Sequence, residues 1–132
     1  MIGIEFLLDT NIVIGLLKEY EPAINLVEEI GVVLEKSAVS QLTRMELLGH
    51  PKITLDDERL IQLFLKECQV LLIDEQIEEK ATQLRRGGLL KLPDAIVAAT
   101  AVVNNLRLLT LHAGRGLQPR LQLLNALIVF ET

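Results

Sequence analysis

Aromatic residues and cysteine are scarce in this sequence. Its 132 residues include no tryptophan, one tyrosine, three phenylalanines and one cysteine. So few aromatic side chains argue against a surface on which nucleic-acid bases stack. The single cysteine, Cys68, excludes an internal disulfide, so the cytoplasm is the expected location. We expect Cys68 to be a partly buried residue without a chemical role, with a reactive thiol as the alternative.

Long apolar runs and excess positive charge are also missing. No apolar run approaches the roughly 20 residues that a membrane span needs, and Glu5 and Asp9 interrupt the region where a signal peptide would be apolar. The formal net charge of −5 argues against a protein that holds nucleic acid mainly by bulk electrostatics. It does not exclude an enzyme that meets phosphates through a metal ion. Walker loops, glycine-rich dinucleotide motifs and HExxH segments are absent as well.

Aliphatic side chains dominate what is present. Half of the residues are hydrophobic, and the length predicts one domain over residues 1–132. Short apolar runs predict strands at residues 4–8, 37–40, 70–73, 106–111 and 127–130. Helical periodicity and capping signals predict helices at residues 11–18, 21–30, 41–48, 56–67, 75–86 and 92–104. Because strands and helices alternate, we expect a three-layer α/β/α sandwich with a mostly parallel central sheet.

Asp9 stands where the first predicted strand passes into the first predicted helix. In an open α/β sheet, ligands bind at the edge formed by the carboxyl ends of the strands. Asp9 is therefore a candidate ligand-binding residue. Capping of the following helix is the alternative, because aspartate accepts hydrogen bonds well at that position.

Glu46 and Asp94 are two further candidates. Glu46 lies in the helix after the second strand, although Thr43-x-x-Glu46 also has the spacing of a capping box. Asp94 opens an apolar helix beside Pro93, where the helix dipole also favours a negative charge. Asp74 likewise follows a strand, so position alone does not select a site.

The helix after Asp94 has no other charged residue up to position 105, which predicts a partly desolvated carboxylate. Carboxylates that converge repel one another and do not all ionise without a counter-ion. A divalent cation with oxygen ligands resolves that conflict, and Mg²⁺ suits a site that keeps several waters. Such a metal activates water and stabilises charge during in-line attack at phosphorus.

Four stretches of the chain, taken together, point to one family. They are Leu-Asp-Thr-Asn at 8–11, Ser-x-x-Thr-x-x-Glu-Leu at 40–47, Leu-Pro-Asp-Ala-Ile-Val-Ala-Ala-Thr-Ala at 92–101 and Leu-Leu-Thr at 108–110. In order and spacing they resemble the PIN domain, in the subgroup of VapC-like ribonuclease toxins of type II toxin–antitoxin systems. The resemblance covers essentially the whole chain. It implies a Mg²⁺- or Mn²⁺-dependent endoribonuclease that hydrolyses RNA, binds a cognate antitoxin protein and forms a homodimer.

The resemblance also implies roles for individual residues. Asp9, Glu46 and Asp94 become the catalytic metal site, with Asp9 and Asp94 as the principal direct ligands. Glu46 either binds the metal or positions the attacking water. Supporting hydrogen bonds are implied for Thr10, Asn11 and Thr43, with ordinary helix capping as the alternative.

His112 is a departure from the family. Two residues after Thr110 the family usually has aspartate or asparagine, and this chain has histidine. Histidine ligates metals but favours softer ions than Mg²⁺. A hydrogen bond at the rim of the pocket is the alternative role for His112. The change also keeps a catalytically weakened, PIN-like binding module open as an alternative function.

Three further expectations remain. Basic residues in the second half form either a local patch for RNA phosphates or ordinary scattered surface charge: Lys91, Arg107, Arg115 and Arg120. A phospho-acceptor signalling domain is a second alternative, but the acidic pair and the late lysine that it needs are missing. Wide apolar stripes on the helices at 12–30 and 56–67 predict that these helices form the homodimer.

Overall fold

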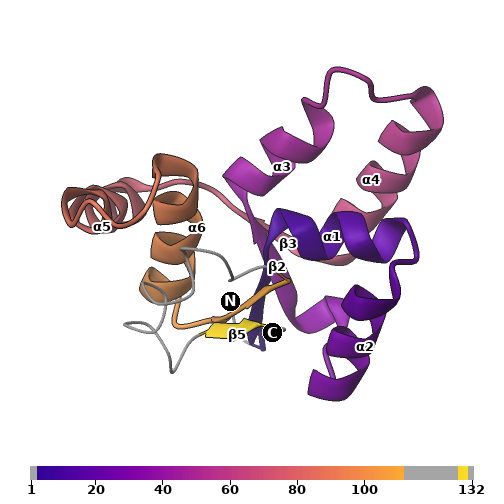
Figure 1. Ribbon diagram of the computed structural model, residues 1–132, viewed down its shortest axis with the longest axis horizontal. Coiled ribbons are helices and arrows are strands. Elements are labelled where there is room, and N and C mark those ends of the chain that lie inside the picture. Colours follow the sequence, from indigo (N-terminus) through magenta and orange to yellow (C-terminus); the bar gives the residue numbers. More distant parts are fainter. Residues whose placement is uncertain (1–2, 112–127, 131–132) are drawn as a thin grey trace.

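A five-stranded sheet forms the centre of the computed structural model, which describes residues 3–111 and 128–130 (Figure 1). The strand order is β3-β2-β1-β4-β5, and every neighbouring pair is parallel. The strands are β1 (Phe6–Leu8), β2 (Ser37–Ser40), β3 (Gln69–Leu71), β4 (Arg107–Thr110) and β5 (Ile128–Phe130). The predicted parallel sheet is thereby confirmed, and β1 is its middle strand.

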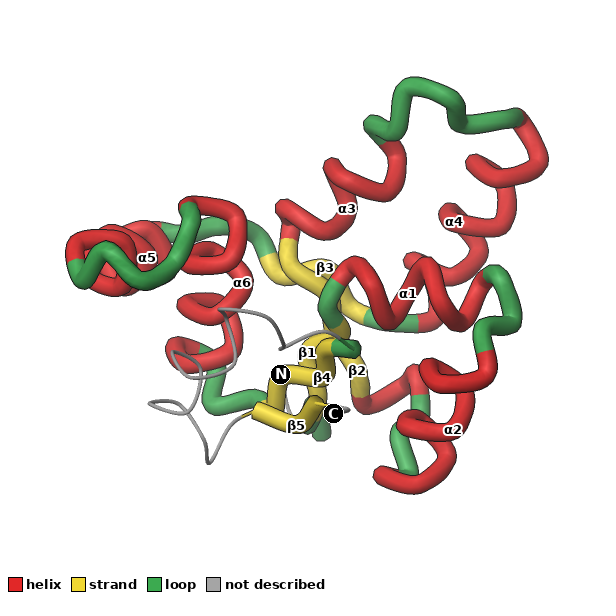
Figure 2. Tube along the Cα trace, in the orientation of Figure 1, coloured by secondary structure: helices red, strands yellow, loops and turns green. Residues whose placement is uncertain are grey.

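Helices cover both faces of this sheet (Figure 2). They are α1 (Thr10–Leu17), α2 (Glu21–Ile30), α3 (Gln41–Leu48), α4 (Leu55–Glu67), α5 (Glu75–Arg86) and α6 (Leu92–Val103), with a 3₁₀ turn, η1 (Leu34–Lys36). Helices α5 and α6 pack together on one face, whereas α1, α2 and α4 lie on the other (Figure 1). Helix α3 neighbours α1, α4 and α6. The expected three-layer sandwich is confirmed.

The protein has two hydrophobic cores, one on each face of the sheet, and the side chains of β1 point alternately into one and the other. Leu7 is buried in the cluster that includes residues of α5 and α6, whereas Phe6 and Leu8 are buried in the cluster with α1, α2 and α4. Successive strand residues point to opposite faces, so three apolar residues in a row need helices on both sides. Six of the twelve residues of α6 are buried, as its alanine-rich sequence predicts. None of the helices in the described part of the chain has the length and apolarity to cross a membrane.

Several predicted boundaries differ from the structure by one or two residues, and side-chain hydrogen bonds explain two of these differences. The third strand ends at Leu71 and not at Ile73, because the backbone N–H of Ile73 donates to Oε1 of Gln41, 2.8 Å away. Helix α4 begins one residue before the predicted Asp56, because Thr54 caps it. The N–H of Asp57 donates to Thr54 Oγ1 (3.0 Å) and the Asp57 carboxylate accepts from the N–H of Thr54 (3.3 Å), which is a capping box.

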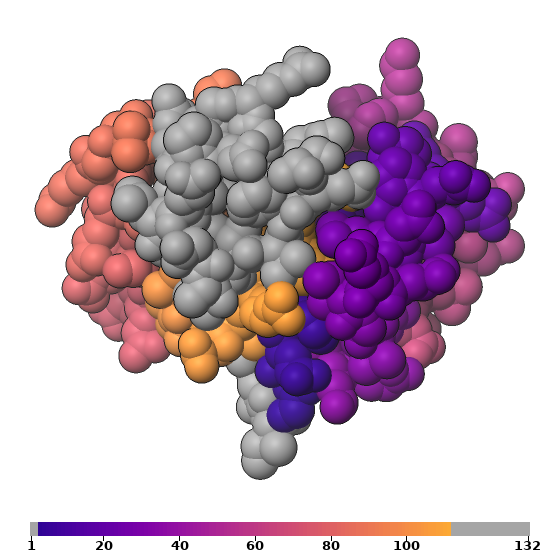
Figure 3. All heavy atoms as spheres, turned by 60° about the horizontal axis from the view of Figure 1, so that its bottom comes forward, coloured from indigo at the N-terminus to yellow at the C-terminus, as the bar shows by residue number. Residues whose placement is uncertain are grey.

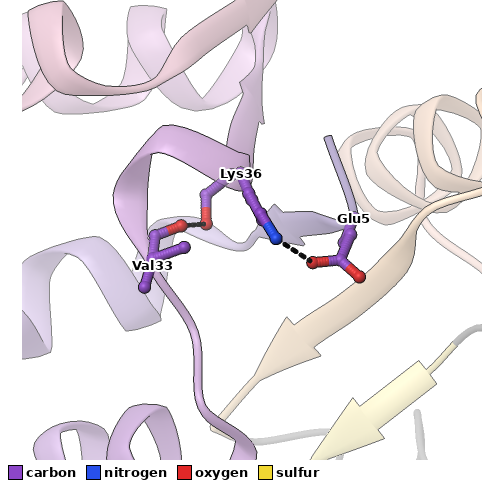
Figure 4. A network of polar contacts seen from close by, with 4 residues as sticks. Glu5, Val33 and Lys36 are labelled. Carbon is purple, nitrogen blue, oxygen red and sulfur yellow. Dashed lines mark hydrogen bonds and ion pairs between the residues drawn. The ribbon is translucent and has the colours of Figure 1, made fainter. Parts of the chain in front are cut away.

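The amino ends of the central strands are joined through Glu5. Its N–H donates to the carbonyl of Lys36 (2.8 Å), and its own carbonyl accepts from the N–H of Arg107 (3.0 Å). The side chains of Glu5 and Lys36 also pair at 3.9 Å (Figure 4), but both are more than half exposed, so this ion pair contributes little. Figure 3 shows the start of the chain (indigo) against the segment near residue 107 (orange). The carboxyl ends of β1, β2 and β4 therefore lie together at the opposite edge.

Candidate functional site

Three acidic side chains come from three elements at the carboxyl edge of the sheet. Asp9 follows β1 and is the N-cap of α1, and its N–H donates to the carbonyl of Leu109 in β4 (2.9 Å). Glu46 lies on α3, which begins directly after β2, and Asp94 is in the first turn of α6. The fold thus gathers at one edge the residues that the sequence predicted for the site.

Both carboxylate oxygens of Asp9 have donors. Oδ1 accepts from the N–H of Thr10 (2.8 Å), and Oδ2 accepts from the hydroxyl of Thr110 (2.9 Å). Asn11 supports this arrangement, since its Nδ2 donates to Thr110 Oγ1 (3.1 Å) and its Oδ1 accepts from the N–H of Leu111 (3.0 Å). Asp9 therefore does cap its helix, while its second oxygen is held by the end of β4.

Glu46 is connected to the buried end of β2 through hydroxyl groups. Thr10 Oγ1 lies 2.6 Å from Glu46 Oε1 and 3.0 Å from Thr43 Oγ1, which in turn lies 3.2 Å from Ser40 Oγ. Each hydroxyl has one proton, and an ionised carboxylate has none. Thr10 therefore donates to Glu46 and accepts from Thr43, and Thr43 accepts from Ser40. The chain of hydrogen bonds ends on the carboxylate.

This geometry removes the structural alternative for Glu46. The N-cap of α3 is Ser40, whose Oγ accepts from the N–H of Thr43 (3.0 Å). A capping box of Thr43 with Glu46 is therefore wrong, because Thr43 is itself the third residue of the helix. Glu46 is exposed and directed to Thr10 on a different helix.

The three carboxylates lie within one another's electrostatic field. Burial raises the pKa of Asp9; hydrogen bonds from Thr110 and Thr10 partly oppose this, and the charges of Asp94 and Glu46 add to the rise. Burial also raises the pKa of Asp94, Glu46 raises it further, and Lys91 lowers it. Among the described residues, no side chain donates a hydrogen bond to Asp94. Asp94 is thus the least restrained of the three.

The donor set fits a hard divalent cation. Within residues 3–111, no three histidine, cysteine, aspartate or glutamate side chains are arranged as a ready metal site. The fit rests on chemistry: three carboxylates repel one another, and the single ion pair found in the described chain, Lys36 with Glu5, is at the opposite edge. Oxygen donors of this kind suit Mg²⁺ and Mn²⁺. Asp9, Glu46 and Asp94 are the residues that would hold the ion.

Sequence motifs alone do not indicate a role for Ser40 or Thr110 in the site. Both are polar and almost fully buried at the ends of apolar strands, with exposed fractions of 0% and 3%. A polar residue that ends a buried strand was the signal available in the sequence, since buried hydroxyls need partners. His112, Arg115 and Arg120 lie outside the described residues.

Two other predicted residues are placed away from the chemistry. Arg107 begins β4 at the amino edge, where its guanidinium lies over the Phe6 ring, 5.8 Å from the ring centroid; of the two expectations for this residue, ordinary scattered surface charge therefore holds and a patch beside the site does not. Cys68 is half-buried, and burial raises the pKa of its thiol to about 11, which leaves it protonated at neutral pH. This agrees with the predicted absence of a chemical role for Cys68.

A groove opens beside Glu46, between α1, α3 and α4. Its volume is about 330 Å³, and most of the residues that line it are aliphatic: Ile14, Leu17, Leu47, Ile53, Leu60 and Ile61. Glu46 itself lines the groove. An apolar surface therefore continues directly from the acidic edge.

Comparison with known proteins identifies one family. The family described as the PIN domain matches residues 6–113. A solved toxin–antitoxin complex from Klebsiella pneumoniae contains a chain with 33% identity and a TM-score of 0.71, over 83% of this chain and 88% of that one.

Two further solved structures match over nearly the full length. FitAcB from Neisseria gonorrhoeae has 25% identity and a TM-score of 0.73, over 96% of each chain. VapBC2 from Rickettsia felis, bound to a DNA fragment from its promoter, has 19% identity and a TM-score of 0.72, over 98% of this chain and 100% of that one. At that identity the likeness concerns the fold alone. None of the curated proteins matches the chain.

Proposed function

The chain belongs to the PIN domain family, and from that premise we propose that it is a metal-dependent endoribonuclease, a VapC-like toxin that hydrolyses RNA phosphodiester bonds. The observation that supports this most is the set of three carboxylates at the carboxyl edge of the sheet. The negative charges of Glu46 and Asp94 act on one another and on Asp9, and none of the three has an ion-pair partner in the described chain.

Each carboxylate has a role in the proposed reaction. Asp9 and Asp94 would hold Mg²⁺ or Mn²⁺, and Glu46 would either join them or orient the attacking water. When bound, the metal would supply a more acidic water and stabilisation of negative charge at phosphorus. Thr10 occupies Oε1 of Glu46, which leaves Oε2 to accept a hydrogen bond from that water. Asp9 is held in one orientation because both of its oxygens accept hydrogen bonds.

Cleavage of single-stranded RNA oligonucleotides, measured with Mg²⁺, with Mn²⁺ and with EDTA, tests this proposal. We expect cleavage with either metal, none with EDTA, and none from Asp9→Asn or Glu46→Gln. Glu5→Gln is the matched control, because Glu5 lies at the opposite edge of the sheet and should leave the rate unchanged. Cleavage that persists in EDTA, or in both site variants, excludes the assigned site.

The second candidate, a weakened binding module, rests on His112, which stands where the family usually has aspartate or asparagine. Such a module would bind RNA without cutting it. Parallel measurements of RNA binding and cleavage by the same preparation separate the two functions.

We also propose a cognate antitoxin as the partner, with both proteins in the cytoplasm. Support comes from the solved relatives, one of which is a toxin–antitoxin complex. The groove between α1, α3 and α4 fits a mainly apolar segment of that partner, because most of its lining residues are aliphatic and Leu60 is 49% exposed, although Lys18, Lys52 and Asp57 also line it. An antitoxin seated there would reach Glu46 at the end of the groove.

The homodimer belongs to the same proposal. Leu55 and Leu63 of α4 are 81% and 54% exposed and do not line the groove. We assign this part of α4 to the second copy of the chain, which leaves the groove for the antitoxin.

A further inference from the structure

We infer that Thr110 is a positioning residue of the site: it directs its hydroxyl proton onto Oδ2 of Asp9 and so fixes the orientation in which that carboxylate meets a metal ion. The inference rests on the proposed function. It concerns a residue on β4 that touches neither substrate nor metal and acts through Asp9.

The direction of each hydrogen bond follows from the backbone of Leu111. Its N–H has only a donor role, so the Asn11 atom 3.0 Å away must be the amide oxygen. The other end of the Asn11 side chain is then the NH₂ group, which donates to Thr110 Oγ1 at 3.1 Å. Thr110 has one proton, and the Asp9 carboxylate at 2.9 Å is the acceptor that remains for it.

Burial makes this chain of hydrogen bonds rigid. Thr110 and Leu111 are only 3% and 5% exposed, the three residues of β4 before Thr110 pair with β1, and Thr110 itself pairs with Phe130 of β5. Hydrogen bonds to a charged acceptor are about twice as strong as neutral ones, and a low local dielectric strengthens them further. Asp9 is thereby held by a strand about one hundred positions later in the sequence.

A purely structural role for Thr110 makes a different prediction. If the role is purely structural, removing the hydroxyl lowers the stability of the protein but leaves the metal affinity of the folded protein unchanged. A positioning role lowers metal affinity and kcat at unchanged KM for RNA. Partners that orient metal ligands typically contribute about 10–100-fold in affinity or activity.

Three variants separate these roles. Thr110→Val removes the hydroxyl at nearly constant size, and Thr110→Ser keeps it. Thr100→Val is the matched control, because Thr100 is also fully buried but donates to the Ile96 carbonyl within α6 and not to a carboxylate. Calorimetric titration with Mn²⁺ alone, thermal melting and RNA cleavage are measured on each.

We expect Thr110→Val to bind Mn²⁺ at least about tenfold more weakly and to lose at least about tenfold in kcat, while Thr110→Ser and Thr100→Val remain close to the wild type. If Thr110→Val binds and cleaves like a wild type that is itself active, the inference is overturned and the proposed function stands. An equal loss in Thr100→Val also overturns it. If the wild type neither binds Mn²⁺ nor cleaves, the proposed function falls and the inference falls with it. Should valine prevent folding, Thr110→Ala removes the hydroxyl without adding a methyl group beside Asn11, and the same outcomes apply.

Discussion

Thr10 contacts two of the three carboxylates at once. Its backbone N–H donates to Asp9 Oδ1 at 2.8 Å, and its hydroxyl donates to Glu46 Oε1 at 2.6 Å. The first contact needs only a helix that starts at this position, whereas the second needs a hydroxyl group on the side chain. The two contacts of Thr10 are therefore separable by mutation.

Thr10→Val should leave the cap on Asp9 intact and release Glu46. Glu46 is exposed and has no other donor among the described side chains, so its orientation depends on Thr10. Because a hydrogen bond to a charged group contributes about 1.5–3 kcal/mol, we expect a loss of about tenfold or more in the rate of RNA cleavage. Thr10→Ser keeps the hydroxyl and serves as the control. Equal rates for the valine and serine variants would contradict this role.

Asp94→Asn should abolish metal-dependent cleavage and raise the melting temperature of the metal-free protein. The carboxylate is partly desolvated, repelled by Glu46 and without a described hydrogen-bond donor, so neutralising it removes an unfavourable charge. Asp74→Asn is the control: Asp74 caps α5 by accepting from the N–H of Ile77 at 2.8 Å, and asparagine caps equally well. Thermal melts in EDTA and RNA cleavage assays measure both effects. Undiminished cleavage by Asp94→Asn would remove this residue from the site.

The stability of the metal-free protein should depend on pH through Asp9 and Asp94. The folded protein raises the pKa of both above the ordinary value of 3.8, so it binds protons more tightly than the unfolded chain. Their contribution to the free energy of unfolding is complete below pH 3.8 and is lost as the pH rises through the folded-state pKa values.

Urea unfolding in EDTA at a series of pH values from 4 upward measures this loss. Asp94→Asn should show a shallower decline than the wild type, because one of the two groups no longer titrates. Parallel curves for the two proteins would contradict the prediction.

Gly15→Ala should destabilise the protein although alanine usually favours a helix. A Cβ at position 15 would stand 2.6 Å from the Cβ of Ala23, so α1 and α2 would have to separate. Overpacking of this kind costs about 1–3 kcal/mol, which exceeds the gain in helix propensity of about 1 kcal/mol. Gly87→Ala is the control, since its nearest contact is 3.4 Å and its φ is −62°. Denaturant unfolding of both variants decides the point, and a stabilised Gly15→Ala would show that α1 and α2 are not in close contact.

The chain alone should be a dimer at tens of micromolar by light scattering. Leu63→Glu should yield the monomer mass, because it places a charge on the exposed apolar side of α4. Leu72→Glu is a control of similar exposure, 58%, on a different part of the surface. A monomer mass for the wild type, or a dimer mass for Leu63→Glu, would contradict the proposed use of α4.

The sequence predicts the layers of this fold better than the residues at which its strands and helices begin and end. Apolar runs and helical periodicity are local, so the order of elements and the two helical layers follow from them. The end of β3 depends instead on Gln41, a side chain 32 positions from its partner Ile73. No local pattern contains that contact.

The same distinction holds at the site. Asp9 and Asp94 are recognisable because each stands at a junction between elements. The sequence does not single out Ser40 as the cap of α3, since Thr43 with Glu46 has equally good capping-box spacing. The role of Thr110 depends on which way one proton points, and that direction is set by Asn11 and the backbone of Leu111.

The pairing of Phe6 with Arg107 joins residues far apart in the sequence, so it also determines when the site can form during protein synthesis. A ribosome adds about 5–20 residues per second, and non-local strand pairing is slow to form. Asp9 and Glu46 are therefore made well before Asp94 and Thr110, so the third carboxylate and the hydroxyl that holds Asp9 are missing until α6 has formed and β4 has docked beside β1. A nascent chain that lacks residues 92–110 has no site. If the proposed ribonuclease activity is correct, this order of synthesis keeps the chain inactive through most of translation, while it is still attached to the ribosome.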